Sequence, residues 1–506
     1  MGDWLGWNAR LANRQAGELA AELSAERVFA ATGTRLTAKA PLAVWRWLAE
    51  SDPERWRALR HWAGVADLAA LALTGEFYTD HTLAGRTAAY RLPGSGEGAA
   101  SAFPAGFDAE LLAAVELPAD RLPQVSHPGQ RILGKTLPKW GPLGIPAGVP
   151  VLVAGHDHAV GAWAAGVRKA GQSADSLGTA EAIYTVVAAR TGIDLVELRA
   201  QGMSLVGTLD GDFALLAGHS AAGAMVSWWL EHHAGELDVA GLGALAASVQ
   251  PDPELIVLPY PFGRNAPAPD PNAQVRLLGR QPWHSAAEEA AAVFNGLALH
   301  AAWMLEVQSE LGGVQPEVTL LGGPGSTNPA WLDAKLRHMP GLRYAVESTE
   351  PVACGAALFA LAATGQASSV LPRREWAAAE PASGRHEALC RARTPYGDIA
   401  DPFDSTLAKD VSIPEHESDF GALLSISHDG LQLRDARSSK PRSQRNADSD
   451  QLENPTRCSG PAVLQPDALQ GHGEHETLLH KRSPEKQGML AAFIQAATSP
   501  EPKEDS

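Results

Sequence analysis

The pattern of hydrophobic and polar residues predicts helices in the first part of the chain. In residues 1–75 we expect one helix in the alanine-, glutamate- and leucine-rich run Ala16–Leu23. A second helix is expected over Pro41–Leu48, because proline is favoured at the first position of a helix. We expect the tryptophans of this part, which share no single helical period, to pack in a core: Trp45, Trp47, Trp56 and Trp62.

From about residue 145 onward the pattern predicts strands that alternate with helices. The short apolar run Val149–Ala154, which ends at Gly155, predicts a buried strand, and the small residues of Ala159–Val167 predict a helix. Such alternation favours an α/β architecture. The other expected elements are strands at Ala174–Leu177 and Ala180–Ala188, a hairpin in Gly202–Leu216, a helix Gly223–His233 with Met225, Trp228 and Trp229 inward, a long helix Ser285–Leu311, a strand Val318–Leu321, and a helix that ends near Ala363.

Composition changes again toward the end of the sequence. Residues 400–506 contain no tryptophan, no tyrosine and three phenylalanines, and serine, proline, glutamine and charged residues dominate. Such a segment cannot bury enough apolar surface to offset the entropy that it would lose on ordering. We therefore expect a disordered tail at 396–506, with at most a transient helix in Gln487–Ala497.

Charge and cysteine content narrow the classes of partner. The formal net charge of −17 argues against a nucleic-acid-binding protein, which needs clustered lysine and arginine. The three cysteines are far apart, form no metal-binding spacing and suit a reducing compartment. No apolar run reaches the roughly 18 residues of a membrane helix, and the first residues lack the features of a signal peptide. We therefore expect a cytoplasmic protein that makes no membrane contact.

Residues 129–136, GQRILGKT, match the phosphate-loop pattern G-x-x-x-x-G-K-[ST]. That pattern binds phosphate only between a buried strand and a helix, whose amides and dipole hold the anion. Here Pro128 precedes the match without an apolar run, and Pro138 and Pro142 follow it. We therefore expect no phosphate site in this stretch and a surface position for Lys135.

Three other stretches carry candidate chemistry. Asp157 follows a predicted strand, where a carboxylate projects into the crevice beyond the strand end, unless it only caps the helix from Ala159. Gly178-Thr179 lies in a tight turn whose amides and hydroxyl can form an anion nest, although such turns are also common without a ligand. Residues 322–328, GGPGSTN, open a helix and permit close approach of a flat ligand, or form a simple turn.

The two histidines beside Asp157 raise the question of a metal site. His156 and His158 flank Asp157, and alternate positions of an extended strand can present two imidazoles on one face. A third and a fourth ligand at the spacing that zinc requires are missing nearby, so we predict no metal there and place an unrelated metal hydrolase last among the alternatives. We expect His232-His233 to lie at a solvated helix end.

These stretches and their order resemble the FGGY family of carbohydrate kinases, and GHDH and SLGTAEA are most similar to its xylulokinase-like members. The resemblance implies the α/β fold of the actin, sugar-kinase and Hsp70 type, which is ribonuclease H-like. It implies two domains, a sugar-side domain at 1–148 and a nucleotide-side domain at 149–395, before the tail at 396–506. The matching stretches are WNARLANRQAGEL, LTGEFYTDHTLAGRTAAYRL, AGHDH, DSLGTAEA, LPYPFGRNAPAPDP, LLGGPGSTNP and ACGAALFALAATG.

The resemblance also implies phosphoryl transfer from ATP, with Mg²⁺, to a hydroxyl of a sugar or polyol. Asp157 matches the catalytic base of the family, and His158 and Trp7 match positions that contact the substrate. Gly355 matches the small residue by which the last helix approaches the adenosine loop. A homodimer is implied by the resemblance alone. The matching nucleotide-binding positions are Gly178 and Thr179 in the second phosphate loop and Gly322, Gly323 and Asn328 in the adenosine loop.

The sequence departs from the pattern of the family at its start. The family opens with an Asp-x-Gly-Thr hairpin that binds Mg-ATP phosphate, followed by a Gly-Gln-x-x-Gly segment that contacts the sugar, and neither is present. Ala9 stands where the W-x-D-x-R segment of the family has aspartate. We therefore expect an incomplete first domain. The alternative to an active kinase is an inactive remnant that binds nucleotide or sugar weakly.

Overall fold

The computed structural model of the chain describes residues 5–6, 11–94, 103, 105–190, 192–233, 235–322, 327–339, 341–348, 350–366 and 370–375, and the backbone of 424–427 and 430–433. The chain forms two compact units, one from Trp7 to Asp404 and one that joins Met1–Gly6 to Ser405–Ser506. In the second unit, β14 (Leu424–Ser427) and β15 (Gly430–Leu433) form an antiparallel hairpin, a feature that the sequence had not predicted. The predicted helical stretch Gln487–Ala497 lies outside the described residues.

A seven-stranded mixed sheet forms the centre of the unit Trp7–Asp404, with the strand order β13-β12-β11-β5-β6-β8-β7. Strand β11 pairs in parallel with both β5 and β12, whereas β5–β6, β6–β8, β8–β7 and β12–β13 are antiparallel pairs. This arrangement confirms the α/β class and the two predicted hairpins. The strands are β5 (Gln172–Leu177), β6 (Glu181–Val187), β7 (Ser204–Gly207), β8 (Phe213–His219), β11 (Glu317–Leu320), β12 (Leu342–Val346) and β13 (Arg373–Glu375).

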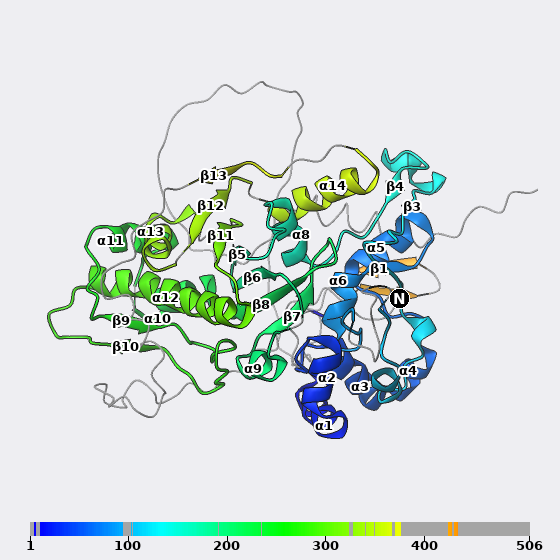
Figure 1. The fold of residues 1–506 in the computed structure, drawn as a ribbon, viewed down its shortest axis with the longest axis horizontal. Coiled ribbons are helices and arrows are strands. Elements are labelled where there is room, and N and C mark those ends of the chain that lie inside the picture. Colours follow the sequence, from blue (N-terminus) through cyan, green and yellow to red (C-terminus); the bar gives the residue numbers. More distant parts are fainter. Residues whose placement is uncertain are drawn as a thin grey trace, which may run out of the picture. The chain divides into compact units, whose positions relative to one another are not determined.

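Helices cover both faces of this sheet, as Figure 1 shows for α12 and α8. Because successive side chains of a strand point to opposite faces, Ile183 and Val187 of β6 join one core while Tyr184 and Val186 join the other. A separate antiparallel pair consists of β9 (Ile256–Leu258) and β10 (Arg276–Leu278). The helices are α8 (Asp157–Ala164), α9 (Leu195–Ala200), α10 (Gly223–His233), α11 (Val239–Ala247), α12 (Ala286–Gly312), α13 (Pro329–His338) and α14 (Pro351–Ala363).

Helix α12 begins within one residue of its predicted start. The Ser285 hydroxyl and the Glu288 carboxylate form a capping box that fixes its first turn. Its 27 residues are long and apolar enough to cross a membrane, although the sequence analysis had identified no such run. The apolar window is 89% buried inside the protein, where α12 packs on the sheet and on α11 and α13. A core helix passes the same test, so this helix is weak evidence for a membrane span.

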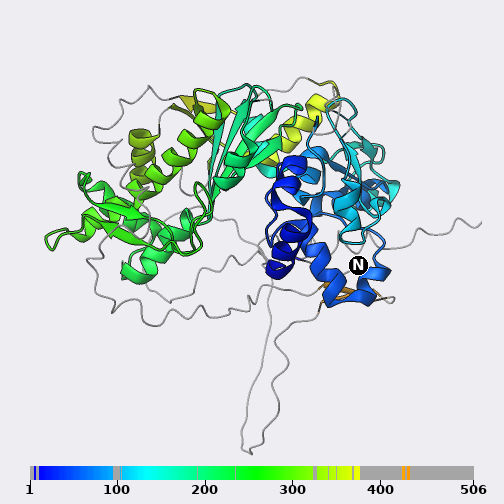
Figure 2. The same ribbon diagram turned by 60° about the horizontal axis from the view of Figure 1, so that its bottom comes forward.

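The N-terminal helices gather around a second hydrophobic core, as the blue helices of Figure 2 show. Trp45 and Trp56 are buried in this core, and Trp47 and Trp62 are half-buried against it. The rings of Trp45 and Trp62 meet edge to face at 5.9 Å, so the predicted core role of these tryptophans is confirmed. The helices of this part are α1 (Asn13–Leu23), α2 (Ala25–Thr32), α3 (Pro41–Ser51), α4 (Pro53–Ala58), α5 (Val65–Thr74), α6 (His81–Ala84) and α7 (Ala109–Ala113), with the 3-10 helices η1 (Gly85–Thr87), η2 (Ala119–Arg121) and η3 (Pro138–Leu143).

The prediction of a buried strand over Val149–Ala154 is wrong. Only β4 (Pro150–Val151) is a strand, paired with β3 (Gly134–Lys135), and Val149 is 42% exposed. Pro150 has no N–H to donate to a ladder, so this run does not extend the main sheet. The predicted surface position of Lys135 is confirmed, and the 3-10 helix η3 rather than an α-helix follows it. A further short pair, β1 (Tyr78–Asp80) and β2 (Gln124–Ser126), is parallel.

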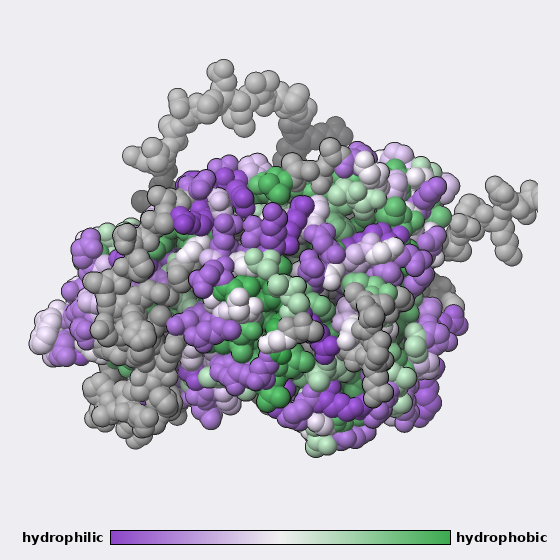
Figure 3. All heavy atoms as spheres, viewed as in Figure 1, coloured by the Kyte–Doolittle hydropathy of each residue, from purple (hydrophilic) through white to green (hydrophobic). Residues whose placement is uncertain are grey.

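Helix α10 has the predicted bounds, and Met225 and Trp229 are buried as expected. Trp228 is only half-buried, because it stacks on the exposed ring of His232 at 4.4 Å. His232 and His233 are both exposed, which confirms the predicted solvated helix end. On the face drawn in Figure 3, hydrophilic residues cover most of the described surface, with smaller apolar areas between them.

Candidate active site

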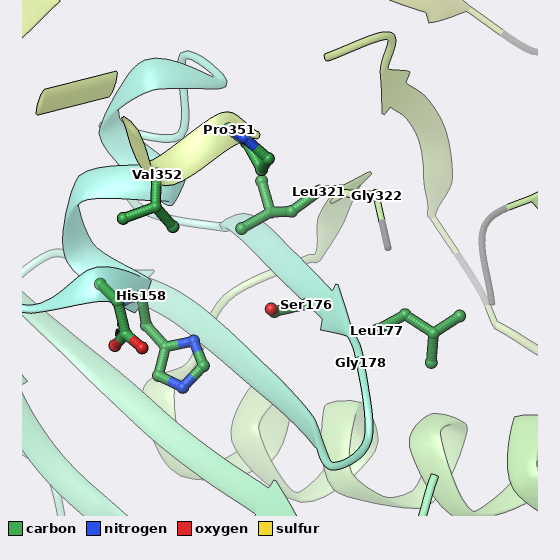
Figure 4. Close-up of a pocket in the computed structure, with 9 residues that line it drawn as sticks. His158, Ser176, Leu177, Gly178, Leu321, Gly322, Pro351 and Val352 are labelled. Atoms are coloured by element: carbon green, nitrogen blue, oxygen red, sulfur yellow. Dashed lines mark hydrogen bonds between the residues drawn. The ribbon is translucent and has the colours of Figure 1, made fainter. Parts of the chain in front are cut away.

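A pocket of about 180 Å³ lies where the neighbouring strands β5 and β11 end and the helices α8 and α14 begin (Figure 4). Ligands of α/β proteins bind in the crevice beyond the carboxyl ends of such strands. The pocket brings together four residues that the sequence predicted: Asp157, His158, Gly178 and Gly322. Its full lining is Asp157, His158, Ser176, Leu177, Gly178, Leu321, Gly322, Pro351 and Val352.

A close approach between α6 and the start of α8 positions Asp157. Gly155 has a φ of +142°, and a side chain at this position would meet the Thr82 hydroxyl at 2.6 Å. Glycine therefore lets the chain pass close to α6, where the N–H of His156 donates to Thr82 Oγ1 at 2.8 Å. The Thr82 hydroxyl donates in turn to the fully buried carboxylate of Asp80 at 2.6 Å. The backbone immediately before Asp157 is thus tied to the N-terminal part of the unit.

Helix α8 begins at Asp157, so the alternative in which Asp157 caps a helix from Ala159 is wrong. The N-cap is His156, whose side chain makes no capping hydrogen bond. Asp157 Oδ1 accepts the N–H of His158 at 2.8 Å and lies 3.2 Å from His156 Nδ1. The side chain is 62% exposed, and within the described residues its Oδ2 makes no hydrogen bond. Asp157 therefore offers one free carboxylate oxygen to the pocket.

The histidines beside Asp157 are neutral near pH 7. Burial lowers the pKa of His156 to about 3, and burial also lowers the pKa of His158. Partial desolvation at the pocket raises the pKa of Asp157, but His156, His158 and Arg86 oppose this effect, and the net direction of the pKa shift is downward. Asp157 is therefore ionised at neutral pH, as a general base must be before it accepts a proton.

Arg86 is a candidate site residue that the sequence analysis did not single out. It lies in η1, four residues after Thr82, and it interacts electrostatically with Asp157. Its Nη1 is buried and has no hydrogen-bond partner in the part of the chain that the structure describes. A buried cation is unfavourable unless a polar group or a ligand completes its hydrogen bonds. The signal in the sequence was its place in the matching stretch LAGRTAAYRL.

The turn between β5 and β6 is fixed from behind by the start of α10. The carbonyl of Gly178 accepts the N–H of Gly223 at 3.0 Å, and the carbonyl of Thr179 accepts the N–H groups of Ala222 and Ala224. The N–H of Gly178 donates to the carbonyl of Ala180, so it is not available to a ligand. Thr179 is exposed, and its N–H and hydroxyl donate to no atom of the described residues. The anion nest that the sequence predicted thus depends on Thr179.

The predicted adenosine loop is described only in part. Gly322 lines the pocket with a φ of +100°, whereas Gly323, like Trp7, lies outside the described residues. Asn328 does not line the pocket. It is the N-cap of α13, where its Oδ1 accepts the N–H groups of Ala330 and Trp331 at 3.1 and 3.2 Å.

Gly355 lets α14 pack closely on α8. Most of the loop 322–328 lies outside the described residues, so the predicted approach of the last helix to that loop stays a prediction. A Cβ at this position would lie 2.8 Å from the Cβ of Ala164 and 2.9 Å from the carbonyl oxygen of Val160. The helix contact brings Pro351 and Val352, at the start of α14, to the pocket beside Asp157.

Comparison with known proteins decides the family. The model for the N-terminal domain of the FGGY family of carbohydrate kinases matches residues 2–164, and the model for its C-terminal domain matches residues 189–364. The chain belongs to the FGGY family of carbohydrate kinases. Members of this family are phosphotransferases that use an alcohol group as the acceptor and ATP as the co-substrate.

Two curated relatives show which FGGY kinases the chain resembles. The xylulose kinase of Streptomyces coelicolor is 27% identical over 384 residues, which cover 74% of this chain and 73% of that protein. The xylulose kinase of Escherichia coli is 27% identical over 286 residues, or 56% of each chain. The chain is thus a xylulokinase-like member of the FGGY family, as the sequence predicted.

A solved FGGY kinase structure confirms the predicted fold class. The crystal structure of xylulose kinase from Rhodospirillum rubrum superposes with a TM-score of 0.64 at 23% identity and covers 75% of each chain. The fold is therefore the two-domain fold of actin and the sugar kinases. The boundaries 1–148, 149–395 and 396–506 stay predictions.

Proposed function

We propose that this chain transfers the terminal phosphoryl group of ATP to a hydroxyl of a sugar or polyol, with a ketose of the xylulose type as the first candidate acceptor. The observation that carries the proposal is the pocket that Asp157, at the start of α8, lines together with the end of β5 and Gly178, the first residue of the Gly178-Thr179 turn. A carboxylate and a phosphate-binding turn in one crevice are what in-line phosphoryl transfer needs.

In the proposed reaction, Asp157 takes the proton of the acceptor hydroxyl as its oxygen attacks the γ-phosphorus. The new oxygen–phosphorus bond forms while the bond from the γ-phosphorus to the β,γ-bridging oxygen breaks, and ADP leaves with that oxygen. The proton passes from Asp157 to solvent, because the side chain is 62% exposed. The low pKa of Asp157 does not prevent this role, since positioning and charge neutralisation supply most of the catalysis.

The nucleotide would lie with its phosphates at Thr179 and its adenosine toward the stretch that starts at Gly322. Thr179 supports this placement because its N–H and hydroxyl are not used by the described protein atoms. Gly322 supports it because it lines the pocket together with Gly178, the neighbour of Thr179, and closely follows β11. We keep Gly323 and Asn328 in the proposed adenosine loop, with Asn328 acting through the helix start that it caps.

Magnesium fits this pocket only if the phosphates of the nucleotide supply most of its ligands. Asp157 is the one carboxylate among the residues that line the pocket, and we assign it to the proton of the acceptor. Mg²⁺ is commonly held by one or two carboxylates with phosphates and water. When bound, it would neutralise charge on the phosphates, and the described residues supply no second carboxylate at the pocket.

The acceptor sugar would lie on the side of Asp157 that faces His158. The His158 ring lines the pocket and is kept neutral by burial, so it can hydrogen-bond a hydroxyl group. We propose Arg86 as a further contact, because its buried guanidinium needs a polar partner. Trp7, outside the described residues, remains a proposed apolar contact.

The test is a coupled assay of ADP release from the full chain over a panel of ketoses, aldoses and polyols. We expect release that depends on one class of acceptor and that disappears in Asp157→Ala. Binding of ADP or sugar without any turnover would favour the alternative function, a catalytically inactive kinase remnant. Size-exclusion chromatography with light scattering tests the predicted homodimer in the same preparations.

A further inference from the structure

A fully buried lysine ties together the two arms of the hairpin that carries the Gly178-Thr179 turn. Lys335 of α13 lies with its Nζ 2.6 Å from Asp175 Oδ2 of β5 and within hydrogen-bonding distance of Glu181 Oε1 of β6. All three side chains have no exposed surface. We name these three residues the Lys335 triad.

The triad is nearly neutral as a whole. Burial and the charge of Asp175 raise the pKa of Glu181 to about 8 against the opposing effect of Lys335, so Glu181 holds a proton near neutral pH. The ammonium of Lys335 is then balanced by one carboxylate, that of Asp175. Asp175 Oδ1 and Glu181 Oε2 have no donor among the described residues, and the proton on Glu181 supplies one.

Stability alone does not account for these buried charges. Replacing a buried ion pair by apolar groups of similar volume is often neutral or stabilising, because desolvation offsets the attraction. A buried set of charges and hydrogen bonds does, however, admit fewer arrangements than an apolar contact. The triad therefore suits a place where the position of the backbone matters more than the strength of the contact.

That place is the junction of the two proposed nucleotide-binding segments. Asp175 lies two residues before the end of β5, and its backbone carbonyl accepts the N–H of Leu321 at 2.9 Å, directly before Gly322. Its side chain meets Lys335 on α13, the helix that follows the predicted adenosine loop. One residue of the arm that ends at Gly178 thus contacts both Leu321, which precedes that loop, and Lys335 on the helix that follows it.

We propose that Lys335 is a positioning residue for the nucleotide: through Asp175 and Glu181 it fixes the Gly178-Thr179 turn relative to α13 and Gly322. This inference rests on the proposed function, in which the turn receives the phosphates of ATP. Lys335 does not line the pocket, so it acts through the backbone of the turn and not by contact with the ligand.

The test compares two variants in the full chain. K335M/D175N removes one cation and one anion together. Because Glu181 is protonated, no unpaired charge is then left in the buried site. E181Q is the matched control, because a glutamine amide mimics the neutral form of Glu181 and keeps an acceptor for Lys335. ATP affinity is measured by calorimetry, and backbone order is measured by hydrogen exchange of the segment 176–182.

We expect K335M/D175N to weaken ATP binding on the order of tenfold to a hundredfold. Adenosine binding should weaken less, because adenosine lacks the phosphates that meet the turn. Exchange in 176–182 should become faster, while E181Q stays close to the native chain in all three measurements near pH 7. Native ATP affinity and native exchange in folded K335M/D175N would overturn the proposal.

Two further results are informative. If K335M/D175N does not fold, D175L/E181M/K335M serves, because apolar side chains of similar volume leave no unpaired polar atom in the buried site. This variant should accelerate exchange in 176–182, and native exchange there would overturn the proposal. If the native chain itself binds no ATP, the proposed function fails, and hydrogen exchange alone decides whether Lys335 orders the turn.

Discussion

Gly355→Ala should destabilise the protein, although alanine is the better helix former. The new Cβ would lie 2.8 Å from the Cβ of Ala164 and 2.9 Å from the carbonyl oxygen of Val160, and neither group is the end of a flexible side chain. The helices α8 and α14 must then separate, and such overpacking costs about 1–3 kcal/mol. Alanine recovers about 0.5–1 kcal/mol of helix propensity, so we expect a net loss of up to about 2.5 kcal/mol, centred on about 1 kcal/mol.

The matched control is Gly17→Ala in α1, where a new Cβ would meet nothing within 4 Å. The free energy of unfolding of this variant should rise by about 0.5–1 kcal/mol, since alanine has the higher helix propensity and its Cβ meets no other atom. The assay is urea unfolding followed by circular dichroism and tryptophan fluorescence. If both variants move the urea midpoint in the same direction, the argument from helix packing is refuted.

A second change tests whether the clash itself is responsible. Ala164→Gly removes the Cβ that Gly355→Ala would meet but leaves the carbonyl of Val160 in place. The double variant should therefore recover part of the stability lost, which appears as a favourable coupling in a double-mutant cycle. Fully additive effects would show that the two sites do not touch as described.

Two other predictions concern charge. Arg86→Met should raise the pKa of Asp157, because Arg86 is one of the groups that lower it, along with His156 and His158. The acid limb of the pH profile of kcat/KM in the ADP-release assay should therefore move to higher pH. An unchanged acid limb would show that Arg86 does not act on Asp157. E181Q should flatten the pH dependence of thermal stability, because the stability contributed by protonated Glu181 is complete below its ordinary pKa of 4.5 and is lost as pH rises through about 8. If the melting temperatures of E181Q and of the native chain change with pH in the same way between about pH 5 and 9, the raised pKa of Glu181 is contradicted.

Local sequence patterns predicted most of the helices and strands of the main sheet and its covering helices. Helix α10 was predicted with its observed bounds, and α12 with bounds that differ by one residue at each end, because a sustained pattern of apolar residues identifies such helices. The Gly178-Thr179 hairpin was found for the same reason, as two apolar strands flank a glycine. The failure at Val149–Ala154 has the opposite cause, since a short apolar run does not reveal whether it pairs with the main sheet or with β3.

The site was predictable where one residue matches a family position, and not where it depends on long-range contacts. Asp157, His158 and Gly178 were identified from the sequence, and the pocket contains all three. Lys335 meets Asp175 across 160 residues of sequence, and no spacing rule connects them. The same holds for Gly355, whose partners Ala164 and Val160 lie on a helix that the sequence did not link to it.

The central claim is that Asp157 acts in the chemical step and not in holding the nucleotide. The decisive measurement pairs the kcat of ADP release with the dissociation constant of ATP for Asp157→Asn, with the exposed Asp120→Asn as the control. We predict that kcat falls by about 10²–10⁴-fold in Asp157→Asn while ATP binds as in the native chain, and that Asp120→Asn changes neither quantity. Native turnover by Asp157→Asn would contradict the account.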